Sequence, residues 1–318
     1  MRWMTATLAL LASPACHPHA NAGQSQSEPA PAPSATSVSS SAVPAPSAAP
    51  STSTSAPAPI PTVTTDWCLP GLTPLAEDVC YVLPPLPADR PRRLVVYLHG
   101  IVPPIPDSQQ QNKVEMVVLH ACIRAGVAAL VPRGRRGFGP AGARDWWAWP
   151  TSASVAPSLV ARWAEAKRAL EAIAGAPFDR TYLAGSSSGA YALTALADRG
   201  AVPSPEFPVD GFAAISGGAV GAGAADRFAR GSPRPFYVGY GTYDDTTTAG
   251  VRALVAALEA AQWPVRAAPH PLGHGTNEVY LDEAFAFFDS EGATGASQGY
   301  TREPSPVHPG GAAPIGPR

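Results

Sequence analysis

A serine framed by glycines is the first feature of this sequence that could do chemistry. The segment Gly185-Ser186-Ser187-Ser188-Gly189 follows an apolar run and precedes a helix-forming one. A strand, a sharp turn and a helix in this order hold the middle residue at a strained tip, with its hydroxyl exposed. We therefore predict that Ser187 is a nucleophile for carbonyl carbon. The backbone N–H of Ser188 is predicted to point at the group attacked.

Two neighbouring serines are the alternatives to Ser187. Ser186 and Ser188 carry the same hydroxyl, but only Ser187 has a glycine two residues before it and another two residues after it. A cluster of glycine and serine is also typical of an ordinary loop. The strand before the cluster and the helix after it favour the nucleophile over the loop.

A serine hydroxyl needs a base to take its proton and an acid to orient that base. His274 lies between two glycines after the last predicted strand and is the candidate base, whereas His270 lies too close to that strand. Asp244 follows an earlier strand and is the candidate acid. Asp245 remains the alternative acid, because one of the two aspartates could instead cap the next helix.

Apolar runs alternate along the chain with segments of helical periodicity. Strands are expected at 80–83, 93–98, 127–131, 181–184, 209–216, 235–240 and 265–270, and helices at 111–125, 154–174, 188–199, 247–261 and 278–289. Such alternation predicts a parallel sheet covered by helices on both faces. Ligands of these sheets bind beyond the carboxyl ends of the strands, where Ser187, Asp244 and His274 all fall.

The order Ser, Asp, His along these strands resembles the α/β-hydrolase superfamily, over about residues 80–289. Gly241-Thr242-Tyr243-Asp244 resembles the family's Gly-x-x-Asp turn, and Leu272-Gly273-His274-Gly275 resembles its histidine loop. The resemblance implies an α/β fold with a mostly parallel sheet and no metal or organic cofactor. The short connection 217–233 predicts that no large cap domain covers the site.

The segment His99-Gly100-Ile101 resembles the family's oxyanion loop. Prolines at 103 and 104 have no N–H, so the donor must be Ile101 or Val102, and Ile101 is preferred. The Ser188 N–H is the second expected donor. His99 is expected to hold the loop and not to act as the base.

A tryptophan-rich loop, residues 145–150, follows the strand at 127–131. Its rings, Trp146, Trp147 and Trp149, are predicted to form an apolar wall for an acyl or aryl group. The loop loosely resembles a segment of secreted polyhydroxybutyrate-depolymerase-like and feruloyl-esterase-like enzymes. The alternative is that individual rings pack beneath the loop.

The N-terminus has the pattern of an export signal. Arg2 precedes a short apolar run and then small residues, so residues 1–22 are predicted to be a signal peptide. Cys16 follows a degenerate lipobox and could be lipidated, which would make the protein a cell-envelope lipoprotein. Cleavage after Ala22 would instead release a secreted protein.

The remaining domain boundaries follow from composition. Residues 23–65 are rich in Ala, Pro and Ser and are expected to be a disordered linker, and residues 291–318 a disordered tail. The hydrolase domain is expected at 66–290. Cys68 and Cys80 are predicted to form a disulfide if the chain is exported, the alternative being two free thiols.

These features predict a serine esterase that acts on a small-molecule or polymeric ester. The formal net charge of −2 gives no electrostatic footprint for nucleic acid, and membrane contact is expected only through a lipid at Cys16. A monomer is expected. The alternatives are a peptidase, an amidase or an acyltransferase on the same fold, or a catalytically silent binding module.

Overall fold

The structure is a computed structural model that describes residues 66–86 and 89–297. These described residues all belong to one compact unit. The predicted signal peptide, Cys16, the linker and most of the tail lie outside the described residues and stay predictions. Within 66–86 and 89–297, no helix is both long and apolar enough to cross a membrane.

A sheet of eight strands forms the centre of the fold, and it is mostly parallel, as the sequence predicts. Its strands, in spatial order, are β1 (Thr73–Ala76), β2 (Val79–Val82), β4 (Ala128–Pro132), β3 (Arg93–Leu98), β5 (Arg180–Ser186), β6 (Gly211–Ile215), β7 (Phe236–Gly241) and β8 (Val265–His270). Only the β1–β2 and β2–β4 pairs are antiparallel. The strand expected at 80–83 is present as β2, but β1, which the sequence does not predict, lies outside it at the edge of the sheet. Pro74 obscures β1 in the sequence, yet an edge strand tolerates a proline.

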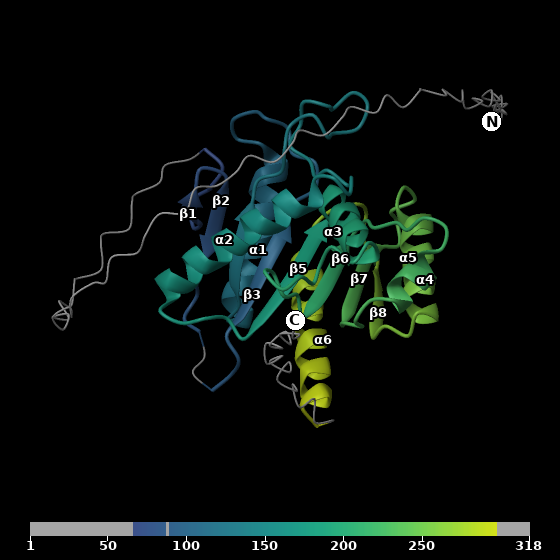
Figure 1. Cartoon of the computed structure of the whole chain (residues 1–318). Coiled ribbons are helices and arrows are strands. Elements are labelled where there is room, and N and C mark those ends of the chain that lie inside the picture. The colour runs from purple at the N-terminus through teal and green to yellow at the C-terminus, as the bar shows by residue number, and fades with distance from the viewer. Residues whose placement is uncertain (1–65, 87–88, 298–318) are drawn as a thin grey trace, which may run out of the picture. The chain divides into compact units, whose positions relative to one another are not determined.

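Helices cover both faces of this sheet (Figure 1). They are α1 (Gln109–Ala125), α2 (Ala156–Ala174), α3 (Ser188–Asp198), α4 (Ala224–Ala229), α5 (Thr248–Ala260) and α6 (Glu278–Ser297). In Figure 1, α2 and α3 lie in front of the sheet and α1 and α6 behind it. Two apolar cores result, one on each face. Strand β3 is buried along its whole length and sends Leu94, Val96 and Leu98 to one core and Val95 and Tyr97 to the other.

The helix α6 corrects the predicted end of the domain. Residues 291–297 were expected to begin the disordered tail, but α6 runs to Ser297. Adding a residue to an existing helix is far easier than starting one, so a helix packed along its first turns can extend without an apolar pattern. The short helix α4 lies in the connection between β6 and β7, and this connection carries no large cap, as predicted.

The segment before β1 is fixed against the rest of the domain by a disulfide between Cys68 and Cys80. Trp67 beside it is 2% exposed, and its indole N–H donates to the Val131 carbonyl at 2.9 Å. The buried Glu115 carboxylate accepts the Leu69 N–H at 2.8 Å. Burial raises the pKa of Glu115 to about 7 despite hydrogen bonds from Leu69 and Gln111. The start of the domain is therefore anchored by covalent and polar contacts.

Replacing both Cys68 and Cys80 with serine should lower the free energy of unfolding by about 2–4 kcal/mol, because the disulfide restricts the conformations of the unfolded chain. Urea unfolding followed by circular dichroism measures the difference. Wild-type protein in reductant is the control and should match the double variant. Equal midpoints for oxidised wild type and double variant would contradict a stabilising disulfide.

Candidate active site

The turn between β5 and α3 places Ser187 at the carboxyl edge of the sheet. Its backbone has φ 50° and ψ −116°, a left-handed conformation that is strained for a residue with a side chain. The Ser187 N–H donates to the Ile215 carbonyl at 2.9 Å, which fixes the turn to β6. A Cβ added at Gly189 would lie 2.0 Å from the Leu98 carbonyl oxygen. Glycine there lets α3 approach the end of β3, so the framing glycines have a steric cause.

Three predicted residues come together at this turn. The Ser187 hydroxyl oxygen lies 3.0 Å from Nε2 of His274, and Nδ1 of His274 lies 2.8 Å from a carboxylate oxygen of Asp244. A carboxylate only accepts hydrogen bonds, so Nδ1 carries the proton and Nε2 is free to accept the serine proton. Asp244 is 3% exposed, whereas the His274 side chain is 43% exposed. His274 therefore contacts Ser187 while part of its ring stays open to solvent.

The Asp244 carboxylate is held ionised by its neighbours. Thr246 donates its hydroxyl at 2.6 Å and its N–H at 3.2 Å to one oxygen, and the Thr247 hydroxyl donates to the other. Burial opposes ionisation, but these hydroxyls and His274 outweigh it and lower the pKa of Asp244 to about 2. An ionised carboxylate keeps the imidazole in the tautomer that presents Nε2 to Ser187.

The structure leaves the two alternative residues outside this constellation. Asp245 is exposed and makes no hydrogen bond to His274 among the described residues. His270 lies 3.2 Å from the Glu283 carboxylate and packs edge-on against Tyr280. Asp244, not Asp245, is therefore the aspartate that contacts the His274 imidazole. The turn that begins at Gly241 approaches the histidine loop closely. A Cβ added at Gly241 would lie 2.2 Å from the Leu272 carbonyl oxygen.

The oxyanion loop follows β3 and lies beside the nucleophile, since a Cβ at Gly100 would be 3.3 Å from the Ser187 Cβ. Val102 donates its N–H to the Trp147 carbonyl at 3.0 Å, so it is not free to bind an oxyanion. Within the described residues the Ile101 N–H makes no hydrogen bond. The Ser188 N–H belongs to the first turn of α3, where backbone donors have no helical acceptor. The backbone N–H groups of Ile101 and Ser188 therefore remain the predicted donors to the oxyanion.

His99 holds this loop in place. Its Nε2 accepts the Gly134 N–H at 2.8 Å, so Nδ1 carries the proton and donates to the Gly100 carbonyl. The rings of Trp67 and Trp149 lie 4.9 and 5.3 Å from its ring. Burial lowers the pKa of His99 to about 4. A neutral, fully bonded imidazole has no capacity left for proton transfer, which agrees with the expected structural role.

The tryptophan loop divides into a buried ring and two half-buried ones. Trp149 is 3% exposed, lies 5.9 Å from the Trp163 ring and donates its indole N–H to the His99 carbonyl at 2.9 Å. The prediction that Trp149 forms a wall for substrate is therefore wrong. Its polar atom is satisfied inside the core, and its ring supports the oxyanion loop from behind.

Trp147 and Trp146 remain candidates for substrate contact. Trp147 is half-buried, and its backbone exchanges two hydrogen bonds with Val102, the residue after the expected oxyanion donor. The Arg133 guanidinium lies over its ring at 4.5 Å, a cation–π contact. Trp146 is also half-buried. The backbone pairing places the loop next to the oxyanion donor.

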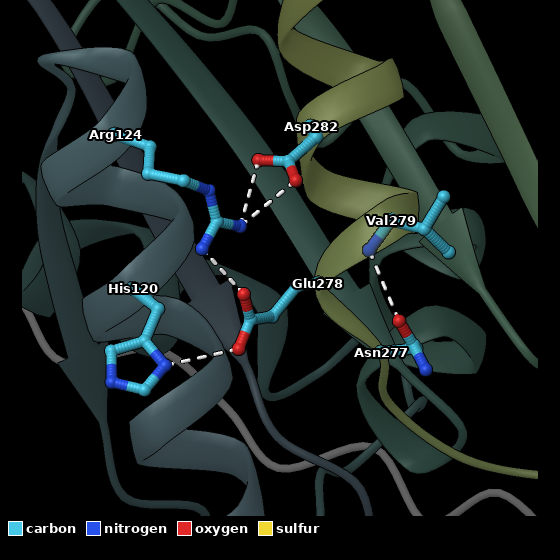
Figure 2. A network of polar contacts seen from close by, with 6 residues as sticks. All are labelled: His120, Arg124, Asn277, Glu278, Val279 and Asp282. Carbon is cyan, nitrogen blue, oxygen red and sulfur yellow. Dashed lines mark hydrogen bonds and ion pairs between the residues drawn. The ribbon is translucent and has the colours of Figure 1, made fainter.

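Helix α6 begins four residues after His274 and is fastened to α1 by charged side chains (Figure 2). Arg124 donates to the carboxylates of both Glu278 and Asp282, and His120 lies 3.0 Å from Glu278. The Asn277 side chain accepts the Val279 N–H at 3.1 Å and so caps the helix start. The hydrogen bonds of His120 and Arg124 lower the pKa of Glu278. This network fixes the far end of the histidine loop.

A cavity of about 480 Å³ lies elsewhere, between the start of α2 and the segment after α3. Its lining includes Ala156, Val160, Arg199 and Glu206, but no residue of the constellation around Ser187. In the part of the chain that the structure describes, no cluster of three or more His, Cys, Asp or Glu side chains could hold a metal ion.

Four features together identify the fold. They are the strand order, the strained turn after β5, the aspartate after β7 and the histidine after β8. The chain has the α/β-hydrolase fold. No protein-family model matches the sequence, and no curated protein matches it.

Several solved structures are similar to the α/β-hydrolase domain. Esterase PE8 is 20% identical with a TM-score of 0.46, over 66% of this chain and 96% of that one. Zea mays acyl-protein thioesterase 2 is 19% identical with a TM-score of 0.45, over 67% and 97%. A carboxylesterase from Mesorhizobium loti is 17% identical with a TM-score of 0.46, over 69% and 95%.

Gly189→Ala should prevent the elbow from closing, because the added methyl group collides with backbone atoms of Leu98 and His99. We expect a loss of stability of about 3 kcal/mol or more, since overpacking against backbone cannot be relieved by a rotamer change. Thermal unfolding measures it. Gly273→Ala is the matched control, with no atom within 4 Å of the added Cβ. Equal melting temperatures for the two variants would refute the steric explanation.

Asp244→Asn should slow the labelling of Ser187 by a fluorophosphonate by about 10⁴-fold, because an amide cannot hold the imidazole in the required tautomer. Asp245→Asn should label at the wild-type rate. Gel-based labelling over time measures both rates. A large loss in Asp245→Asn with none in Asp244→Asn would reverse the assignment of the acid.

Proposed function

We propose that this chain is a serine hydrolase that cleaves carboxylic esters through an acyl-enzyme. The observation that carries the proposal is the unbroken chain of hydrogen bonds from Ser187 through His274 to the buried Asp244, at 3.0 and 2.8 Å. A serine hydroxyl becomes an effective nucleophile when a positioned base accepts its proton. The ionised state of Asp244 supports the same role, because it stabilises the imidazolium that forms.

In the first half of the reaction, the Ser187 oxygen attacks the ester carbonyl while its proton moves to Nε2 of His274. The carbonyl electron pair moves to the oxygen, which becomes an oxyanion. When this pair returns, the bond to the alcohol breaks, and His274 gives its proton to the departing alkoxide. Ser187 is left as an acyl ester.

In the second half, water takes the place of the alcohol. His274 removes a proton from the water, and the resulting oxygen attacks the acyl carbon. Collapse of the second tetrahedral intermediate breaks the bond to Ser187, which recovers its proton from His274. The carboxylic acid leaves, and the enzyme returns to its starting state without any cofactor.

The N–H groups of Ile101 and Ser188 are proposed to stabilise the oxyanion in both halves. Two observations support this proposal. The loop that holds Ile101 lies beside Ser187, and Ser188 lies at the start of α3, where backbone dipoles favour negative charge. Trp146 and Trp147 are proposed to contact the acyl or alcohol group. The short connection between β6 and β7 supports an accessible site, which suits small or polymeric esters.

Ser187→Ala should lower turnover of p-nitrophenyl esters by several powers of ten, because it removes the hydroxyl that is proposed to carry the acyl group. Wild type and variant are compared on a series of rising acyl chain length. The chain length at which kcat/KM peaks would size the acyl pocket.

Two results would overturn the proposal. In the first, wild type is inert on every ester and also resists a fluorophosphonate, which would favour a silent binding module. In the second, Ser187→Ala is as active as wild type.

A further inference from the structure

Two adjacent segments carry a second hydrogen bond beside the catalytic one. The Thr276 hydroxyl donates to the Ser186 hydroxyl at 2.8 Å. Ser186 comes directly before Ser187, and Thr276 comes two residues after His274. Both side chains are buried, Ser186 at 1% and Thr276 at 5% exposure. The nucleophile strand and the histidine loop are therefore joined twice, once at the surface and once behind it.

Tyr97 on β3 extends this buried bond. Its hydroxyl lies 3.2 Å from the Thr276 oxygen. Thr276 has one hydroxyl proton and donates it to Ser186, so Tyr97 must be the donor in the other contact. Burial raises the pKa of Tyr97 to about 12, so its proton stays in place. In this row of hydrogen bonds, Tyr97 therefore donates to Thr276, and Thr276 donates to Ser186.

The residue between His274 and Thr276 is held from a third strand. The Ser216 hydroxyl, directly after β6, donates to the Gly275 carbonyl at 2.8 Å. Ser216 is fully buried and has φ 46°, a left-handed conformation rare for serine. The ends of β3, β5 and β6 therefore all contact the two residues that follow the base.

The histidine loop needs such anchors because its own backbone is permissive. His274 lies between Gly273 and Gly275, and Gly275 has φ 136°. Glycine adopts many conformations at little cost, so the sequence around the base does not by itself restrict where the imidazole lies. Bonds to the rigid sheet must supply that restriction.

We propose that Thr276 and Ser186 are positioning residues that set the distance between Ser187 and His274. The inference rests on the proposed function, since it concerns the same nucleophile and base. Acyl transfer requires the reacting groups within a few tenths of an ångström of the productive geometry. The buried bond supplies this by fixing the residues on either side of the catalytic pair. The three consecutive serines then have separate roles. Ser186 positions the loop, Ser187 is the nucleophile, and the Ser188 hydroxyl accepts the backbone N–H of Trp149 at 3.1 Å.

The test is a set of substitutions at the two ends of the buried bond. Thr276→Val keeps the shape and removes the donor, Thr276→Ser keeps the donor, and Ser186→Ala removes the acceptor. Turnover of a p-nitrophenyl ester is measured for each, per site titrated with fluorophosphonate, so that unfolded protein does not count. Thr194→Val is the matched control, since it removes a buried hydroxyl whose single hydrogen bond among the described residues goes to the Ala190 carbonyl within α3.

We expect kcat per active site to fall about 10- to 100-fold in Thr276→Val and in Ser186→Ala, with KM changed less than about threefold. Thr276→Ser should stay near wild type, and so should Thr194→Val. The double variant of Thr276→Val with Ser186→Ala should lose no more than the worse single variant, because both remove the same bond.

The inference is overturned if kcat per active site is unchanged in Ser186→Ala or in Thr276→Val. It is also overturned if Thr276→Ser loses as much as Thr276→Val, or if the losses in the double variant multiply. If Thr276→Val does not fold, Ser186→Ala at the other end of the bond decides the question. Failure of the proposed function itself is distinct, because wild type would then be inert before any of these variants is compared.

Discussion

The close approach of the β5–α3 elbow to the end of β3 is the constraint on which the rest of the site depends. Only glycine fits where α3 meets the Leu98 carbonyl, and only a strained backbone at Ser187 completes the turn. This contact places the oxyanion loop beside Ser187. It also leaves the first backbone N–H groups of α3 facing the Ser187 side chain. The geometry of attack is thus decided by backbone packing before any side chain takes part.

Buried hydrogen bonds then hold the other partners to this fixed point. Asp244 is ionised by two threonine hydroxyls and His274, and His99 is kept neutral by burial between two tryptophans. A buried polar group without a partner costs free energy, so each of these groups restricts its neighbours to the arrangement that satisfies it. The same logic makes the Tyr97–Thr276–Ser186 chain rigid. The geometry of the exposed site therefore depends on the hydrogen bonds of the buried polar groups behind it.

Glycine spacing and strand order predict Ser187, Asp244 and His274, but they do not reveal residues whose role depends on the interior of the fold. Trp149 looked like part of a substrate wall, but its ring supports the oxyanion loop from the core. Thr276, Ser216 and the threonines after Asp244 were missed. Isolated hydroxyl residues are common in loops, and no local pattern shows which one is buried against a distant strand. The run of three threonines that begins two residues after Asp244, at Thr246, is a local signal for hydroxyl donors to this carboxylate.

The sequence by itself determined the alternation of strands and helices, the position of the elbow and the order of Ser187, Asp244 and His274 at the strand ends, because these depend on apolar periodicity and on glycine spacing. Only the tertiary structure decided between Asp244 and Asp245, between His274 and His270, and between Ile101 and Val102. Within each pair the two residues are chemically equivalent or nearly so. They differ only in which distant atom they reach, and chain packing alone sets that distance.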